Sequence, residues 1–332
     1  MGEEGPGRRG MRGSTEIRRQ HVFAAAAAVF LLIMPVGRPQ AMECLPSQVQ
    51  GSIAPAGVDQ PSDIAIGPKG RIFLVDGVNN RVVVTDAGGT PQFTFGRAGG
   101  GMGELRYPMG IDISRKGQIF IADTGNHRVA VFDLEGGFLY AFPVKAAAGE
   151  KPAAPVDVLA LDRKNYLYVA DKDNHKIKVH KQKGAFVFEW GGFGEERGRF
   201  RYPGILAANP YNQVFVVDVL NTRVQVFDPD GNFLTEISTW GVSPGRLFRP
   251  KGVAVDKSDR VFISDSFMGC VQAFTDLGGF LGVVCAGGTK RSFTTPVGIV
   301  FDADNRLLVV EMRANRVSIV KVAPKLHKKD GQ

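Results

Sequence analysis

Hydrophobic and polar positions alternate over short stretches through most of the chain. Residues 108–142 show the pattern: PMGIDIS, RKGQIFIAD, TGNHRVAVFD and LEGGFLYAF each hold one apolar stretch, bounded by Gly, Asn, Asp or Lys. Val, Ile and Phe dominate, and period-two alternation with such residues is typical of β-strands. The segment therefore predicts four short antiparallel strands, which we call a to d. No stretch of helical period interrupts them.

This four-strand pattern recurs six times. Each copy begins at a proline, and an acidic residue closes its second apolar stretch, with spacings of 46 to 48 residues for both landmarks. The prolines are Pro61, Pro108, Pro155, Pro203, Pro250 and Pro296; the acidic residues are Asp76, Asp123, Asp171, Asp218, Asp265 and Glu311. Two landmarks that stay in phase over six copies indicate a true internal repeat.

A four-stranded unit of this size cannot bury both of its faces alone, whereas six units packed radially can. The last copy supplies only three strands before a polar tail, and Gln48–Ala54 lies where a fourth strand would precede Pro61. We therefore predict an all-β, six-bladed β-propeller of four-stranded antiparallel blades, its sixth blade closed by the N-terminal strand. The predicted boundaries are 1–41 (signal peptide), 42–60 (closing segment), 61–322 (repeats) and 323–332 (basic polar tail).

The N-terminal segment predicts export. Five arginines lie before the 15-residue apolar run at 22–36, and small residues follow it up to Ala41. This order matches a secretory signal peptide, and the run is shorter than the ~20 residues of a membrane-spanning helix. We expect a periplasmic or extracellular protein with no membrane span after cleavage. An uncleaved N-terminal anchor stays open, as does twin-arginine export through Arg18-Arg19.

The amino-acid composition adds little to the predicted fold, but the distribution of charge narrows the class of partner. The 42 glycines suit many tight turns, and the formal net charge is +8. Residues 1–41 carry +3 of that charge and the tail from Lys325 carries +2, so the repeats keep only +3. A protein that binds nucleic acid through its overall charge needs more, so we do not expect nucleic acid as the partner.

Three cysteines are too few for a disulfide scaffold, but two of them face each other in the predicted pattern. Cys270 lies in strand c of the fifth copy and Cys285 in strand d, at equal distances from the turn at 276–279. Residues directly opposite in a hairpin lie close enough for a disulfide. We predict a Cys270–Cys285 bond, which suits an exported protein. Cys44 is then left over.

The segment Pro108–Asp133 and the Asn-x-Arg-Val cores of the second and fourth copies (126–129 and 221–224) resemble the NHL repeat. The resemblance covers 61 to about 322, and it implies a six-bladed propeller. The third and fifth copies depart from it, with Lys176 and Cys270 in place of the arginine. Fold alone says little about function, because this family includes RNA-binding, sensor, secreted and enzymatic members.

The acidic and basic positions that recur in the copies predict a structural network. They are Asp76, Arg81, Asp123, Arg128, Asp171, Asp218, Arg223, Asp265, Glu311 and Arg316. Six equivalent sites are a repeat rather than a catalytic centre. We expect the carboxylates to accept hydrogen bonds from turn amides and the arginines to brace neighbouring strands.

One face of the predicted propeller collects the d–a and b–c connections. Three d–a connections, at 96–107, 191–202 and 241–249, are long and basic. Their candidate binding residues are Arg97, Arg106, Arg197, Arg199, Arg201, Tyr202, Arg246 and Arg249. Two interpretations stay open: a basic, aromatic binding surface, or aromatics that plug gaps between blades and arginines that brace the loops.

Residues for catalysis are fewer. His127 and His175 occupy equivalent b–c positions, but two ligands do not make a metal site. Asp63 and Asp157 occupy equivalent places in strand a, and oxygen ligands of this kind suit calcium, although more are needed. No nucleophilic triad and no phosphate-binding loop is recognisable. We predict no cofactor, with a divalent metal such as calcium left open.

Together these observations favour a non-catalytic binding scaffold that uses its d–a and b–c face. The expected partner is an exported or envelope protein, or an extended anionic ligand. Two alternatives stay open: a metal-assisted lyase or lactonase with a site in the central tunnel, and an RNA-binding NHL domain.

Overall fold

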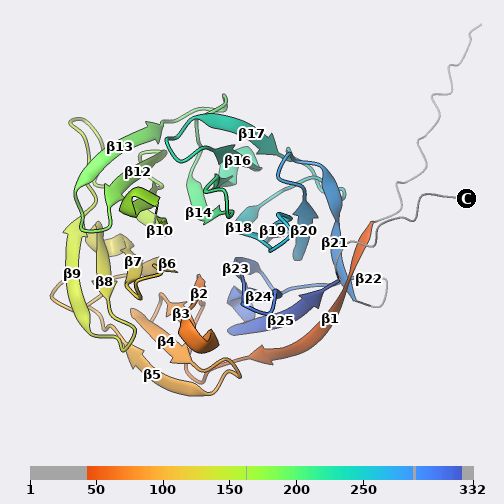
Figure 1. Cartoon of the computed structure of the whole chain (residues 1–332), viewed down its shortest axis with the longest axis horizontal. Helices are drawn as coiled ribbons and strands as arrows, with labels where there is room; N and C mark the ends of the chain where they lie inside the picture. Colours follow the sequence, from red (N-terminus) through yellow and green to blue (C-terminus); the bar gives the residue numbers. More distant parts are fainter. Residues whose placement is uncertain (1–42, 162, 287–288, 324–332) are drawn as a thin grey trace, which may run out of the picture. The chain divides into compact units, whose positions relative to one another are not determined.

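The structure is a computed structural model that describes residues 43–161, 163–286 and 289–323. The predicted signal peptide and the tail beyond residue 323 lie outside the described residues. The described part is a ring of six blades around a central axis, so the predicted fold class is confirmed (Figure 1). Among the described residues, no helix is long and apolar enough to cross a membrane.

Each blade consists of four antiparallel strands, which follow chain order from the axis outward in blades one to five, whereas the N-terminal β1 is the outermost strand of blade six. Blades one to three consist of β2 (Ile64–Ile66), β3 (Ile72–Asp76), β4 (Arg81–Thr85) and β5 (Pro91–Phe95); β6 (Pro108–Ile113), β7 (Ile119–Asp123), β8 (Arg128–Phe132) and β9 (Phe138–Pro143); and β10 (Pro155–Leu161), β11 (Tyr166–Asp171), β12 (Lys176–Lys181) and β13 (Phe186–Gly191). Blades four to six consist of β14 (Pro203–Ala208), β15 (Val214–Asp218), β16 (Arg223–Phe227) and β17 (Phe233–Ile237); β18 (Pro250–Val255), β19 (Val261–Asp265), β20 (Cys270–Phe274) and β21 (Phe280–Ala286), with the short β22 (Thr289–Lys290) beside it; and β23 (Pro296–Phe301), β24 (Arg306–Glu311), β25 (Arg316–Val322) and β1 (Cys44–Ile53).

The hydrophobic core is divided into six layers, one in each gap between neighbouring blades. Phe73 of blade one packs with Ile121 and Phe132 of blade two, and Val310 of blade six packs with Leu74 of blade one. The other four gaps hold equivalent clusters. Because strand b is covered on both faces, it reads as a continuous apolar run rather than an alternating one in blades one, two and four.

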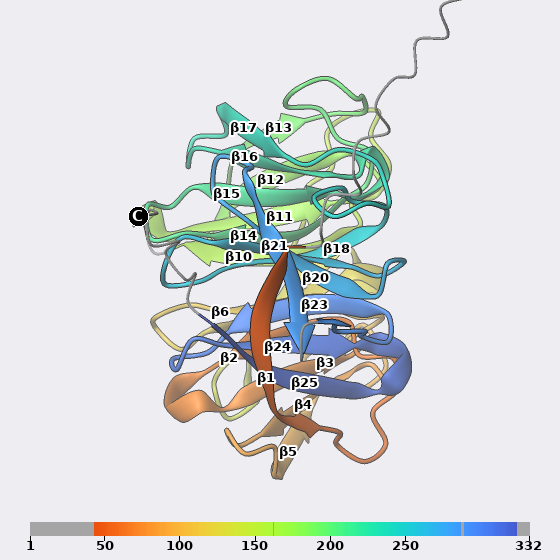
Figure 2. The same ribbon diagram turned by 90° about the vertical axis from the view of Figure 1, so that its right-hand side faces the viewer.

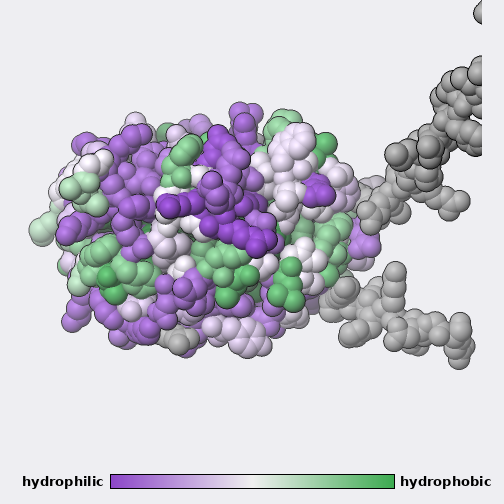
Figure 3. Space-filling view, turned by 90° about the horizontal axis from the view of Figure 1, so that it is seen from above, coloured by the Kyte–Doolittle hydropathy of each residue, from purple (hydrophilic) through white to green (hydrophobic). Residues whose placement is uncertain are grey.

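The outermost strands are partly exposed and have mixed surfaces. Strands such as β9 and β17 hold mostly half-buried and exposed positions, with one buried residue each. Figure 3 shows one side of the propeller, where separate hydrophobic patches lie among hydrophilic surface. Five short 3-10 helices lie in the described turns: η1 (Pro68–Gly70), η2 (Thr124–Asn126), η3 (Arg163–Asn165), η4 (Val219–Asn221) and η5 (Met312–Ala314).

The N-terminal strand closes the ring, as predicted, and extends further than expected. β1 pairs antiparallel with β25 from Ser47↔Val322 to Ile53↔Val317, which completes blade six. Its first residues, Cys44 to Pro46, pair in parallel with β21 of blade five. Figure 2 shows β1 running beside β25, with one end next to β21. One strand therefore joins two blades into a single nine-stranded sheet.

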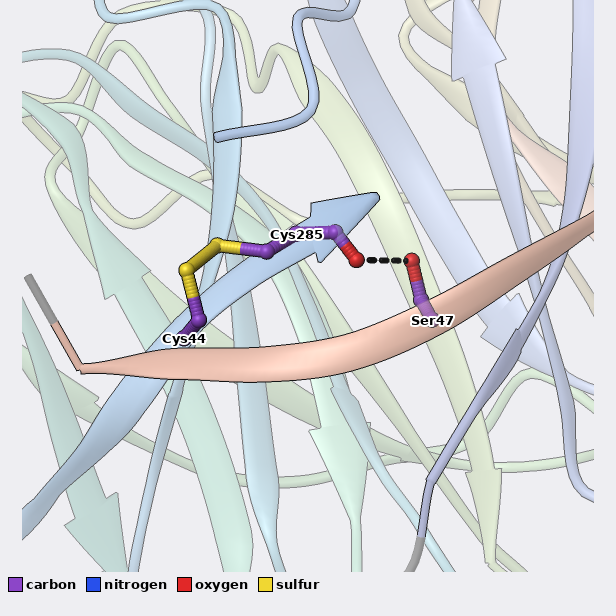
Figure 4. The surroundings of a disulfide bond; sticks show 3 residues. All are labelled: Cys44, Ser47 and Cys285. Atoms are coloured by element: carbon purple, nitrogen blue, oxygen red, sulfur yellow. Dashed lines mark hydrogen bonds between the residues drawn. A yellow bond between two sulfur atoms is a disulfide. The ribbon is translucent and has the colours of Figure 1, made fainter. Parts of the chain in front are cut away.

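The predicted Cys270–Cys285 disulfide is wrong. Cys285 is bonded to Cys44, and Cys270 is a buried free thiol (Figure 4). Pairing between β20 and β21 ends at Gln272↔Val283. Beyond that point Cys285 pairs with Pro46 of β1 at one edge of β21 and with Lys290 of β22 at the other edge. No edge of β21 is left there to pair with β20, which is strand c of this blade.

A hydrogen bond beside the disulfide also joins β1 to β21. The hydroxyl of Ser47 donates to the carbonyl of Cys285 at 2.8 Å, so a second contact holds β1 to β21 beside the disulfide. The bond clamps the closing strand to blade five, which the sequence pattern of blade five alone does not reveal.

We predict that Cys44→Ser lowers the free energy of unfolding by about 2–5 kcal/mol, because the bond closes a long loop. Cys270→Ala removes only a small buried side chain and should cost about 1 kcal/mol. Urea unfolding measures both values. Peptide mapping without reductant should recover a Cys44–Cys285 peptide; a Cys270–Cys285 peptide would contradict the assignment.

Candidate functional site

The acidic residue that ends strand b has an equivalent backbone donor in every blade. Its carboxylate accepts a hydrogen bond from the amide 17 residues earlier, in the segment leading into strand a. The pairs of donor and acceptor are Asp59–Asp76 (3.1 Å), Arg106–Asp123 (2.7 Å), Ala154–Asp171 (2.9 Å), Arg201–Asp218 (2.8 Å), Phe248–Asp265 (2.7 Å) and Thr294–Glu311 (2.7 Å). Buried carboxylates need such donors, because an unpaired buried charge is costly. These acids tie each d–a connection to its blade.

Four of the acids also pair with an arginine at the start of strand c. The pairs are Arg81–Asp76 (2.8 Å), Arg128–Asp123 (2.7 Å), Arg223–Asp218 (3.0 Å) and Arg316–Glu311 (2.9 Å). In blade three Lys178 approaches Asp171 instead, at 3.4 Å. In blade five Cys270 stands at the arginine position, and Asp265 accepts four backbone hydrogen bonds.

The side chain of the residue just before strand c links four of the blades to the next one. This residue has a left-handed backbone in all six blades, with φ between 51° and 59°. The side chain of Asn80 accepts a hydrogen bond from the amide of Tyr107 at 2.8 Å, and that of Asn315 accepts one from Gln60 at 2.9 Å. These acceptors hold the residue before the opening proline of the following blade.

The two candidate metal-binding histidines occupy this linking position. Nδ1 of His175 accepts a hydrogen bond from the amide of Tyr202 at 3.2 Å, and Nδ1 of His127 lies 2.7 Å from the carbonyl of Ala153. Burial, together with the nearby charge of Lys151, lowers the pKa of His175. Both rings are therefore engaged in joining adjacent blades.

The three long d–a connections share one folded shape. A parallel bridge crosses each of them, at Ala98↔Leu105, Phe193↔Phe200 and Trp240↔Leu247. The second residue of each bridge is fully buried and plugs the gap between two blades. Phe193 and Trp240 are exposed at 69% and 68%. The aromatic residues of these loops are therefore divided between packing and surface.

Most of the candidate arginines make local contacts. Arg97 pairs with Glu104 at 3.2 Å and Arg201 with Glu195 at 2.8 Å. The other contacts run from Arg199 to the carbonyl of Gly191, from Arg246 to the hydroxyl of Thr239, and from Arg197 to the ring of Phe233. The amide of Arg106 donates to Asp123. Arg249 and Tyr202 differ from these residues, because their side chains line a central cavity.

This central cavity, which we call the mouth cavity, opens among the b–c connections and the first residues of strand a. Its volume is about 580 Å³. The residue after the opening proline of every blade lines it: Ser62, Met109, Val156, Gly204, Lys251 and Val297. Lys172 and Arg313 of the b–c connections join Arg249 and Lys251, so four cations line the cavity, and no acidic side chain does among the described residues.

Three of these cations were missed from the sequence. Lys172 and Arg313 lie one and two residues after the acid that ends strand b, and Lys251 lies one residue after a proline. A signal for Lys251 existed in the repeat itself, because the residue after each opening proline lies at the same end of the axis.

Exposed apolar side chains gather on the same face as the mouth cavity. They are Val78, Met102, Tyr107, Met109, Phe193, Tyr202, Leu220, Trp240, Val242 and Phe267. Phe248 stacks on Phe267 with ring centroids 4.2 Å apart and lies beside Arg249 in the chain. On the opposite face the charged turns pair across blades, as in Lys164–Asp230 and Arg71–Glu135.

A second cavity of about 200 Å³, the inner cavity, lies further along the same strands. Asp63, Asp112 and Asp157 line it together with apolar residues of strand a. Each carboxylate accepts a hydrogen bond from the amide of a neighbouring blade: Ile111 to Asp63 (3.0 Å), Ala160 to Asp112 (2.7 Å) and Leu206 to Asp157 (2.6 Å). The predicted candidates Asp63 and Asp157 therefore line the same cavity, and their hydrogen bonds join adjacent blades.

Burial makes this pair retain a proton near neutral pH. It raises the pKa of Asp63 to about 7, and burial together with the nearby charge of Asp63 raises the pKa of Asp157 well above its ordinary value. Oδ1 of Asp157 is buried without a donor, and a proton shared with Asp63 satisfies it. The described residues hold no group of three or more His, Cys, Asp or Glu side chains placed for a metal ion.

Comparisons with known proteins agree with this geometry. The model of a family described as 6-bladed beta-propeller matches residues 58–194 and 205–280. No curated protein matches the chain.

Solved structures with the same fold include three enzymes. A streptogramin B lyase is 12% identical (TM-score 0.60; 85% of this chain and 99% of that chain covered). A catalytically inactive virginiamycin B lyase from Staphylococcus aureus with quinupristin is 15% identical (TM-score 0.61; 85% and 90%). A gluconolactonase from Xanthomonas campestris is 15% identical (TM-score 0.62; 88% and 99%). At these identities the likeness shows the fold alone.

We predict that Asp157→Asn flattens the pH dependence of stability. The folded protein holds a proton that the unfolded chain releases above its ordinary pKa of 3.8, so the pair destabilises the fold as pH rises from about 4 through about 7. Between these limits the free energy of unfolding should fall by on the order of 2 kcal/mol more in the wild type than in the variant. Urea titrations across this range measure the difference. The control variant Asp304→Asn, at an exposed position, should show the same pH dependence of stability as the wild type. Equal pH dependence in the wild type and both variants would contradict the shared proton.

Proposed function

The chain belongs to the 6-bladed beta-propeller family, and on that premise we propose that it is a non-catalytic binding protein of an oxidising, exported compartment. It takes its ligand on the face formed by the d–a and b–c connections. One observation carries the proposal: a cluster of cations and exposed apolar side chains gather on this face around the mouth cavity, and three of the cations have no ion-pair partner among the described residues. Such a combination suits recognition, whereas the opposite face uses its charges to join blades.

Two further features support the exported location. A disulfide clamps the closing strand, and stable disulfides are typical of oxidising compartments. The first 41 residues have the order of a secretory signal peptide. The partner that fits best is an exported or envelope protein, or an extended anionic ligand that lies across this face.

The proposal includes NHL-type repeats as the finer description of the family. The support comes from the Asn-x-Arg-Val cores, in which Asn126 and Arg128 both donate to Asp123. Asn221 and Arg223 donate to Asp218 in the same way. The repeat signature thus corresponds to one hydrogen-bonded unit.

We predict that Trp240→Ala reduces capture of the natural ligand at least tenfold, because a large exposed anchor is lost from the binding face. Tyr211→Ala is the matched control, since Tyr211 lies on the opposite face and both side chains are exposed at 68%. Quantitative mass spectrometry of material retained from the exported fraction measures the effect. Equal retention by the two variants would overturn the choice of face.

The buried acid pair favours a second candidate, an enzyme with a site in the tunnel. A carboxyl group that keeps its proton near neutral pH is suited to general acid catalysis. Two neighbours in fold are a virginiamycin B lyase and a gluconolactonase, which suggests cyclic esters as substrates to test.

The first proposal predicts no turnover of virginiamycin B or gluconolactone above that of Asp157→Asn. Chromatography of the products over several hours measures this. A rate in the wild type at least a hundredfold above the variant, with unchanged folding, would favour the enzyme instead.

A further inference from the structure

We propose that the mouth cavity is a specific site for a small amphiphilic anion, in which a carboxylate or phosphate group is joined to an apolar body. This inference rests on the proposed function, because it names the ligand chemistry that the loop-rich face would take. It concerns the cavity itself rather than the surrounding loops.

The charges of the cavity lack counterions. Arg249, Lys251 and Arg313 have no ion-pair partner within the described part of the chain, and Lys172 pairs only at 3.6 Å with the solvent-exposed Asp173. The acids that end the b strands do not serve as counterions, because their carboxylates already accept hydrogen bonds from backbone amides. Like charges gathered in a concave site repel one another, and a bound anion removes that repulsion.

Lys251 is the central cation of this arrangement. It follows Pro250 at the start of β18 and is half-buried, unlike the exposed Arg249. Burial lowers the pKa of Lys251, and the charges of Arg249 and Lys172 lower it further. An ammonium group held away from water beside two other cations gains most from a negative partner.

The rest of the lining fits an apolar body. Val156, Ile205, Val219, Leu220 and Met312 provide hydrocarbon surface. The hydroxyl groups of Ser62 and Ser266 donate to the carbonyls of Met109 and Arg249, so both are already engaged. The volume lies within the ~300–1,000 Å³ range of small-molecule sites, and the cations mark where the polar end of the ligand lies.

The test uses three related molecules: 2-naphthoate, 2-naphthyl phosphate and the neutral 2-naphthalenemethanol. Calorimetric titration of the disulfide-bonded protein at low salt should show binding of at least one anion, at least tenfold tighter than that of the neutral molecule. Added salt should weaken binding of the anion and leave the neutral molecule unchanged. Binding of naphthoate alone would assign a carboxylate ligand, and binding of the phosphate alone a phosphorylated one.

Lys251→Met should weaken anion binding at least tenfold, because it keeps the hydrocarbon stem and removes the charge. Lys151→Met, on the same face but outside the cavity, and Lys183→Met, on the opposite face, should change affinity less than twofold. Thermal unfolding should show that Lys251→Met is folded and no less stable than the wild type, since a repelled charge is removed.

Equal affinity for the neutral molecule, or unchanged affinity in Lys251→Met, would overturn the anion site. The two proposals fail separately. Loss of natural ligand in Trp240→Ala, with no naphthoate or phosphate binding, would leave the binding face standing and remove the anion site. Anion binding that depends on Lys251, with ligand capture unaffected by Trp240→Ala, would leave the anion site standing and overturn the binding face.

Discussion

Closure of the ring is the constraint on which the rest of this structure depends. Every blade buries its two faces against two different neighbours, so a gap left open exposes a full layer of apolar side chains. The last gap is sealed through β1, which adds the fourth strand to blade six and continues onto blade five. Its disulfide to Cys285 makes that seal covalent. Both central cavities exist only because six first strands are held around one axis.

A single hydrogen-bonding scheme repeats around that ring and tolerates exceptions. The acid at the end of strand b always receives the amide 17 residues earlier, whereas the arginine is replaceable. In blade three the fully buried Lys178 takes over, with Glu150 at 2.6 Å and Asp171 at 3.4 Å as its partners. In blade five Gln272 instead ties the loop, since its side chain accepts from Gly245 and donates to the carbonyl of Arg246. The backbone contact is thus the invariant part.

The fold could be predicted from the sequence because the repeat period and the missing fourth strand of the last copy are both local patterns. The disulfide could not be predicted in this way. The position of Cys44 depends on how far β1 extends past blade six, and the repeat period carries no information on that length. The candidate site was predicted in part. Loop composition pointed to Arg249 and Tyr202, but most loop arginines found neighbours within their own loops. Lys172, Lys251 and Arg313 come together only when blades three, five and six meet at the axis.

The path of β1 also sets the order in which this protein is completed. Its partners, Val322 and Cys285, are made long after it, so the first strand of the propeller can pair only once the last repeats have been made. Until the final repeat emerges, blades five and six present unpaired strand edges, which are features that promote wrong pairing between chains. The pairing of β1 with β25 and the Cys44–Cys285 bond therefore both join segments from opposite ends of the propeller.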